Sequence, residues 1–163
     1  TWHNHNFYKY SLLFCLRGDK NCKSYLESAN DIMNLANDDI QNLLLTPFKY
    51  FNDSAAISLI EKNKNEYVFS KKLFGEKYLI SKQSTLDIYD ALLVLKYINK
   101  SKNENIRLVT NYLIEILENS ENYFEYEPGD LMIVKESSTI RYSPKYKPSN
   151  SEKEKRWLLA LSI

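Results

Sequence analysis

The last third of the sequence alternates short apolar runs with turn signals, and this spacing limits what the chain can fold into. An aromatic-rich segment at 123–126 precedes the turn pair Pro128-Gly129, and an apolar run follows at 131–134. A lysine-rich stretch at 145–155 then leads to the run RWLLALSI at 156–163. Short strands separated by turns and loops are typical of antiparallel sheets, so this region predicts a β-sandwich or jelly roll.

Helices are expected between the strands of the first half. The run YSLLFCLR at 10–17 is short, apolar and followed by a turn cluster, which predicts a buried strand. Two short helices are expected after it, at 28–35 and 37–45, because Ser28 and Asn37 are favourable N-cap residues. The fold class is therefore mainly β with helical insertions.

The middle of the chain has a mixed pattern. The segments 66–69 and 77–81 favour strand, and they could pair with each other or belong to one sheet. Residues 85–98 carry apolar side chains at helical spacing, but 86–89 could equally end a strand. A helix over 103–118 is clearer, because its apolar residues form a single stripe.

Composition favours a single soluble domain over residues 1–163. The chain is 44% apolar, which is enough for a real core, and its net charge of +1 creates no global field that recruits nucleic acid or an acidic membrane. Small molecules are the expected partners. Two cysteines do not form a disulfide scaffold, and no apolar run reaches the roughly 18 residues that span a bilayer. A reduced, cytoplasmic location is the simplest expectation.

The first segment, TWHNHNFYKY, contains both histidines of the chain. It begins without an initiator Met and is rich in aromatic residues, so we expect that an N-terminal section of the domain is missing. On a strand, His3 and His5 would share a face and could hold one metal ion. The alternative is that this pair packs or forms hydrogen bonds among the aromatic residues.

The sequence lacks the motifs of several other chemistries. With 3 glycines it has no glycine-rich phosphate loop, and it has no CxxC pair for zinc. No GxSxG turn is present, and neither histidine has the context of a nucleophile's partner. The basic stretch at 145–156 has the composition of a solvated loop rather than of a nucleic-acid groove.

The order of several segments resembles a known family. PGDLMIV, SPKY and RWLLALSI follow one another as in the TauD and clavaminate synthase-like Fe(II)- and 2-oxoglutarate-dependent oxygenases, particularly those that hydroxylate free amino acids. At the front, WHNHNFYKYSLLFCLRGD is similar to the family form FHPHRPDYLLLFCLRGD. The resemblance covers nearly the whole chain and implies a double-stranded β-helix, the jelly roll of these enzymes.

The same resemblance implies where an iron site would lie. In that family an H-x-D/E motif and a distal His hold Fe(II) in a facial triad. The first motif would precede this chain, so His3 and His5 match histidines that are not ligands. The family pattern GDLLIVDNRRAVH, laid without gaps on GDLMIVKESSTIR, places the distal His at Arg141 and the usual Asn at Glu136. A gapped alignment places Thr139 at the ligand position instead, and threonine is not a usual iron ligand.

An arginine at the distal-His position changes which ligands can bind there. A guanidinium stays protonated and offers no lone pair, so Arg141 cannot bind Fe(II) and would repel it. Arg156 matches the family's anchor for the far carboxylate of 2-oxoglutarate, a role that suits a bidentate fork. The second Arg of the family's RWLxR is Ala160 here, which leaves recognition of a substrate carboxylate at that place in doubt.

Three functions stay open. The first is a degenerate oxygenase fold whose iron site is lost or incomplete and which binds a small carboxylate or an amino-acid-like ligand through Arg141 and Arg156. The second is an active Fe(II)- and 2-oxoglutarate-dependent amino-acid hydroxylase, completed by residues upstream of Thr1. The third is a protein-interaction module whose sheet edge pairs with a partner chain. Fold-level analogy does not by itself decide among them.

Overall fold

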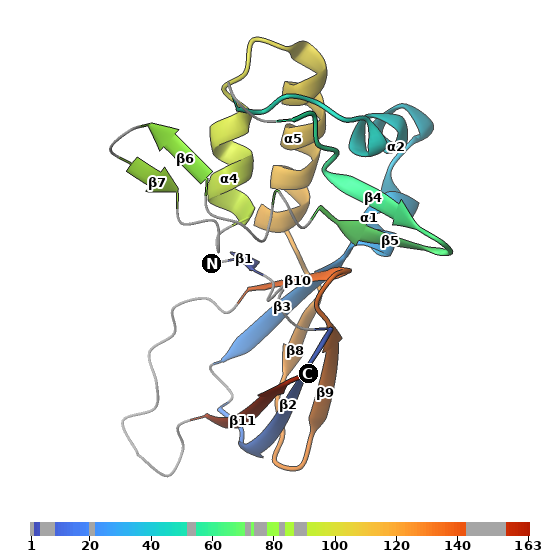
Figure 1. Ribbon diagram of the computed structural model, residues 1–163. Helices are drawn as coiled ribbons and strands as arrows, with labels where there is room; N and C mark the ends of the chain where they lie inside the picture. Colours follow the sequence, from blue (N-terminus) through green and yellow to red (C-terminus); the bar gives the residue numbers. More distant parts are fainter. Residues whose placement is uncertain are drawn as a thin grey trace.

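Two antiparallel sheets form one end of the molecule, and helices with two short hairpins form the other (Figure 1). The computed structural model describes residues 2–3, 9–19, 22–51, 55–70, 73, 78–81, 84–86, 91–142 and 156–163. Within these residues, the sheet strands alternate between the two sheets for most of the chain.

The four-stranded sheet has the order β1-β10-β3-β8, and the three-stranded sheet has the order β11-β2-β9. Every neighbouring pair is antiparallel. Consecutive strands repeatedly pass from one sheet to the other, which is the winding of a jelly roll. The strands are β1 (Trp2–His3), β2 (Tyr10–Arg17), β3 (Lys23–Ser28), β8 (Tyr123–Glu125), β9 (Leu131–Lys135), β10 (Thr139–Tyr142) and β11 (Trp157–Ser162).

A helical insertion separates β3 from β8. It contains the helices α1 (Ala29–Leu35), α2 (Asp38–Leu45), α4 (Ala91–Ile98) and α5 (Glu104–Glu118), and the hairpins β4 (Ile60–Asn63) with β5 (Glu66–Phe69) and β6 (Tyr78–Ser81) with β7 (Ser84–Leu86). The expected N-caps are confirmed: the Ser28 hydroxyl accepts from the Asp31 amide at 3.0 Å, and the Asn37 side chain accepts from the Ile40 amide at 2.9 Å. None of the described helices is both long and apolar enough to cross a bilayer.

The helical insertion covers one face of the four-stranded sheet. Ile140 of β10 is 2% exposed and belongs to the same core cluster as Val109 and Leu113 of α5. Tyr25 of β3 and Tyr142 of β10 pack against this cluster, with their ring centroids 6.0 Å apart. Because side chains alternate along a strand, the residues next to Tyr25 on β3 and next to Tyr142 on β10 point to the opposite face, toward the three-stranded sheet.

The outer face of the three-stranded sheet is apolar and exposed. Its strands pair in register, so side chains from all three form one continuous surface, as with Phe14 of β2 between Leu131 of β9 and Leu159 of β11. The exposed large apolar side chains of these strands and their ends are Phe14, Leu16, Leu131, Ile133, Trp157, Leu159, Leu161 and Ile163. An apolar surface of this extent is uncommon on a soluble monomer.

Most elements expected from the sequence are present, and the pairing in the middle of the chain is a correction. Segments 66–69 and 77–81 do not pair with each other, because β5 pairs with β4 and β6 pairs with β7. The ambiguous stretch 85–98 divides into the end of β7 and helix α4. Strands β3, β4 and β10 were not among the expected elements.

Candidate functional site

A cavity of about 190 Å³ lies between the two sheets. The three-stranded sheet supplies Leu13, Met132 and Leu158, and the facing four-stranded sheet supplies Ser24, Leu26 and Arg141. Tyr126, just after β8, and Arg156, just before β11, complete the lining. The two arginines that the sequence singled out therefore lie at one cavity.

Arg141 reaches this cavity because it lies opposite Leu26 on β3, on the face turned away from the helices. Its Nη2 atom lies 3.2 Å from Glu136 Oε1, and the two side chains are 14% and 0% exposed. The Arg141 Nη1 atom is buried, and no hydrogen-bond acceptor for it is found among the residues that the structure describes. A buried ion pair with a spare donor can accept a further anion.

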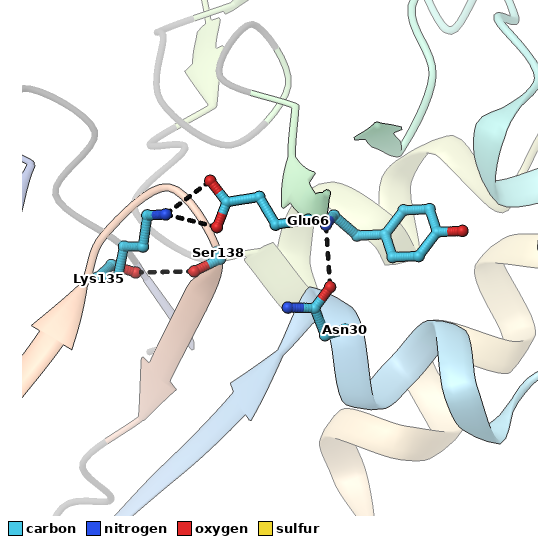
Figure 2. A network of polar contacts seen from close by, with 5 residues as sticks. Asn30, Glu66, Lys135 and Ser138 are labelled. Carbon is cyan, nitrogen blue, oxygen red and sulfur yellow. Dashed lines mark hydrogen bonds and ion pairs between the residues drawn. The ribbon is translucent and has the colours of Figure 1, made fainter. Parts of the chain in front are cut away.

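The turn that carries Glu136 is anchored from the helical insertion (Figure 2). Lys135 at its start forms an ion pair with Glu66 of β5, and the Ser138 hydroxyl at its end donates to the Lys135 carbonyl at 3.5 Å. The Phe69 amide donates to the carbonyl of Ser137 at 2.9 Å. These contacts hold the turn in place, so Glu136 meets Arg141 in a fixed position.

Hairpin β4–β5 is itself joined to α1 next to this turn. The Asn30 side-chain oxygen accepts a hydrogen bond from the Tyr67 amide at 2.9 Å, and Figure 2 shows this bond beside the Lys135–Glu66 pair. The β9–β10 turn is thereby linked through the hairpin to the first helix of the insertion.

Arg156 contacts the polar end of the cavity. One of its guanidinium nitrogens donates to the Ser24 hydroxyl at 3.2 Å, and its guanidinium carbon lies 5.7 Å from the centre of the Tyr126 ring. Tyr126 is 5% exposed, and its hydroxyl donates to the Met132 sulfur at 3.3 Å. Burial raises the pKa of the Tyr126 phenol, although Ser24 and the two arginines act to lower it. Tyr126 is therefore a neutral hydrogen-bond donor at ordinary pH.

Two glycines shape the backbone behind Tyr126. A Cβ atom on Gly18 would lie 2.1 Å from the Tyr126 carbonyl oxygen, so the two segments touch backbone to backbone. Gly129 has φ +98°, which favours glycine, and its amide donates to the Cys15 carbonyl at 2.8 Å. The Cys15 amide in turn donates to the Asp130 carbonyl at 2.8 Å. The Pro-Gly-Asp segment thus starts β9 in register with β2.

The other residues singled out from the sequence lie near this site or outside the described residues. Thr139 pairs with Ser28 in the four-stranded sheet and is not part of the cavity lining. The backbone of His3 lies at the register position opposite Arg141, and His5 is outside the described residues. Ala160 lies opposite Leu13.

The residues at the cavity do not fit an iron ion. Its lining includes two guanidinium groups and contains no imidazole or carboxylate among the described residues. Across the part of the chain that the structure describes, no three His, Cys, Asp or Glu side chains form a group that could hold a metal ion. Since cations repel Fe(II) and guanidinium offers no lone pair, we derive no reaction step through iron at this cavity.

Sequence reasoning missed three of the residues at the site. Ser24 lies on β3, a strand that the sequence did not predict. Tyr126 lies just after β8, and the sequence did not indicate which strands lie beside β8. The alignment marked Glu136 as a departure, but it did not indicate that Glu136 contacts Arg141. A carboxylate five residues before an arginine, in the polar segment that follows the apolar run at 131–134, was the available signal.

Comparison with known proteins supports the fold. No protein-family model matches the sequence, and a search of curated proteins finds no significant match. Among solved structures, asparagine oxygenase matches with TM-score 0.64 and 16% identity over 100% of this chain and 48% of the other. The non-heme iron oxygenase OrfP in complex with Fe matches with TM-score 0.60 and 13% identity over 100% of this chain and 52% of the other.

These comparisons show the architecture and not the activity. The chain spans about half the length of the solved structures it matches. A further structure is asparagine oxygenase in complex with Fe(II), 2S,3S-3-hydroxyasparagine and succinate, with TM-score 0.60 and 14% identity. Over the part of those proteins that it covers, this chain therefore has the fold of asparagine oxygenase and of OrfP.

Proposed function

We propose that this chain is a degenerate member of the iron and 2-oxoglutarate oxygenase fold, whose cavity binds a small carboxylate instead of iron. The observation that supports this most is the position of Arg141, which lies with Arg156 at the cavity between the sheets. Residues 1–163 would then form part of one jelly-roll domain.

The cavity has the donors that a carboxylate needs. The Arg141 and Arg156 guanidinium groups and the Tyr126 hydroxyl belong to residues that line one space, and the Ser24 hydroxyl there accepts a hydrogen bond from Arg156. Charge-assisted hydrogen bonds to a carboxylate are stronger than neutral ones, and burial strengthens them further. The carboxylate would compensate positive charge that Glu136 alone does not balance.

Before a ligand binds, the carboxylate of Glu136 offsets part of the positive charge of Arg141. It lies 3.2 Å from Arg141 and is fully buried, so it holds the guanidinium in one orientation. A pre-oriented fork loses less conformational freedom on binding than a mobile one. In this proposal Glu136 positions Arg141 and does not contact the ligand.

The alternative function is an active amino-acid hydroxylase with further residues outside this chain. Its support is the shared fold with asparagine oxygenase and OrfP. Its difficulty is the guanidinium of Arg141 at the cavity, because an arginine cannot replace an iron ligand.

Two titrations test the proposal. The protein is first titrated with Fe(II) and 2-oxoglutarate without oxygen, and no visible charge-transfer band is expected. It is then titrated calorimetrically with acetate, 4-methylpentanoate, glutarate and leucine, and at least one of these should bind. Substitution of either Arg141 or Arg156 by Met should remove that binding. Stoichiometric iron binding, or no binding of any carboxylate, would overturn the proposal.

A further inference from the structure

The cavity between the sheets is amphipathic, and its two kinds of wall come from different elements. The three-stranded sheet contributes only apolar side chains, those of Leu13, Met132 and Leu158. Arg141 and Ser24 lie on the four-stranded sheet with the apolar Leu26, Tyr126 follows β8, and Arg156 precedes β11. One end of a bound molecule would therefore meet donors and the rest would meet hydrocarbon.

We propose, resting on the carboxylate site proposed above, that the ligand is a monocarboxylate with a short apolar chain, rather than a dicarboxylate or an amino acid. Its carboxylate accepts from the Arg141 guanidinium and from Tyr126. Its chain packs against Leu13, Met132 and Leu158.

The Tyr126 hydroxyl can donate to a carboxylate because the acceptor of its proton is weak. It donates to the Met132 sulfur at 3.3 Å, and a thioether is a poor acceptor compared with a carboxylate oxygen. When a carboxylate replaces the Met132 sulfur as the acceptor, the Met132 side chain can pack with the other apolar side chains of the wall. Both changes favour the bound state.

A second carboxylate on the ligand is unfavourable here. It would lie against the apolar wall, where the described lining residues offer it no donor. Burying an ionised carboxylate without partners carries a large desolvation cost. Glutarate should therefore bind much more weakly than a monocarboxylate of similar length.

An α-ammonium group is also unfavourable. The cavity presents the guanidinium groups of Arg141 and Arg156 next to the carboxylate position. Glu136, the carboxylate that forms an ion pair with Arg141 in the described part of the chain, already contacts that guanidinium at 3.2 Å. An ammonium would meet cations without a carboxylate of its own, so it is repelled.

The size of the cavity limits the chain of the ligand. A volume of about 190 Å³ has room for a carboxylate with a chain of a few carbon atoms. Each buried methylene should strengthen binding about three- to fourfold until the space is filled. Affinity should thus rise from acetate to pentanoate and then level off or fall.

Three ligands of closely similar carbon skeleton test the inference by calorimetry. 4-Methylpentanoate carries a single carboxylate, leucine is the same molecule with an α-ammonium, and glutarate has a carboxylate at each end of a three-carbon chain. We expect 4-methylpentanoate to bind at least about tenfold more tightly than either of the others. The Arg141→Met protein should lose this binding, whereas Arg107→Met, at an exposed position on α5, should keep it.

The outcomes separate this inference from the function on which it rests. If none of the ligands binds to folded wild-type protein, the carboxylate site itself is refuted. If leucine or glutarate binds as tightly as 4-methylpentanoate, the carboxylate site stands and the apolar monocarboxylate is refuted. Leu158→Ala gives a second check, since it should weaken 4-methylpentanoate severalfold and leave acetate unchanged; equal losses for both ligands would contradict the assigned orientation.

Discussion

The Arg141 guanidinium lies 3.2 Å from the carboxylate of Glu136, and both groups are almost removed from solvent. Removing one partner of such a pair leaves the other charge buried without compensation. We expect Arg141→Met to lower the free energy of unfolding by about 3–5 kcal/mol, and Glu136→Gln to be destabilising as well. Urea unfolding followed by circular dichroism measures both.

The double variant is the control for this pair. Because Arg141→Met with Glu136→Gln removes both charges, it should recover part of the loss, giving a coupling energy of about 1–3 kcal/mol. Strictly additive losses would mean that the two side chains do not stabilise each other.

Gly18→Ala should disturb the site through the backbone. The added methyl group would lie 2.1 Å from the Tyr126 carbonyl oxygen, and backbone cannot move aside as a flexible side chain can. Overpacking of this kind costs about 1–3 kcal/mol, so the unfolding midpoint in urea should fall. Gly129→Ala tests the other glycine, where φ +98° and not crowding is the constraint. A Gly18→Ala protein of wild-type stability would show that the close approach of these segments is wrong.

Tyrosine ionisation should weaken the fold at high pH. Burial raises the pKa values of Tyr50, Tyr112 and Tyr126 above the ordinary value near 10. The folded state therefore retains phenolic protons that the unfolded chain loses, so this contribution to stability is complete below about pH 10 and is lost as pH rises further.

Absorbance at alkaline pH checks this expectation. Among the 13 tyrosines, a late-titrating group should be visible in the folded protein and absent in urea. Tyr126→Phe should remove part of the late phase. A single titration near the ordinary pKa in the folded protein would contradict the buried environments.

The outer face of the three-stranded sheet should bind hydrophobic dyes in the native state. Leu161 there is 59% exposed and has apolar neighbours, whereas Leu108 of α5 is 49% exposed and lies away from this sheet. Leu161→Lys should lower dye fluorescence clearly more than Leu108→Lys does, because it interrupts a continuous apolar surface. Equal small effects of the two substitutions would show that the face is covered in solution.

Much of the β framework could be predicted from the sequence. The runs at 10–17, 131–134 and 156–163 are apolar and bounded by turns, and they became β2, β9 and β11. The prediction missed β3, KSYLES, because polar residues occupy most of it. Glu27 in that strand is 3% exposed and accepts a hydrogen bond from Ser120, a partner 93 residues away that no local pattern indicates.

The candidate site could also be predicted only in part from the sequence. Spacing and the family resemblance pointed to Arg141 and Arg156, and both line the cavity. The roles assigned to them stay predictions. Tyr126 and Ser24 could not be found, because they meet the arginines only once both sheets are assembled around the helical insertion.

We propose above that the cavity lined by Arg141 and Arg156 binds anions and not iron. Anaerobic titration with Fe(II) in the presence of 2-oxoglutarate, followed by visible absorption, tests it most directly. We expect no charge-transfer band and no stoichiometric iron binding in folded protein. A saturable band at one iron per chain, with oxygen consumption on exposure to air, would contradict it.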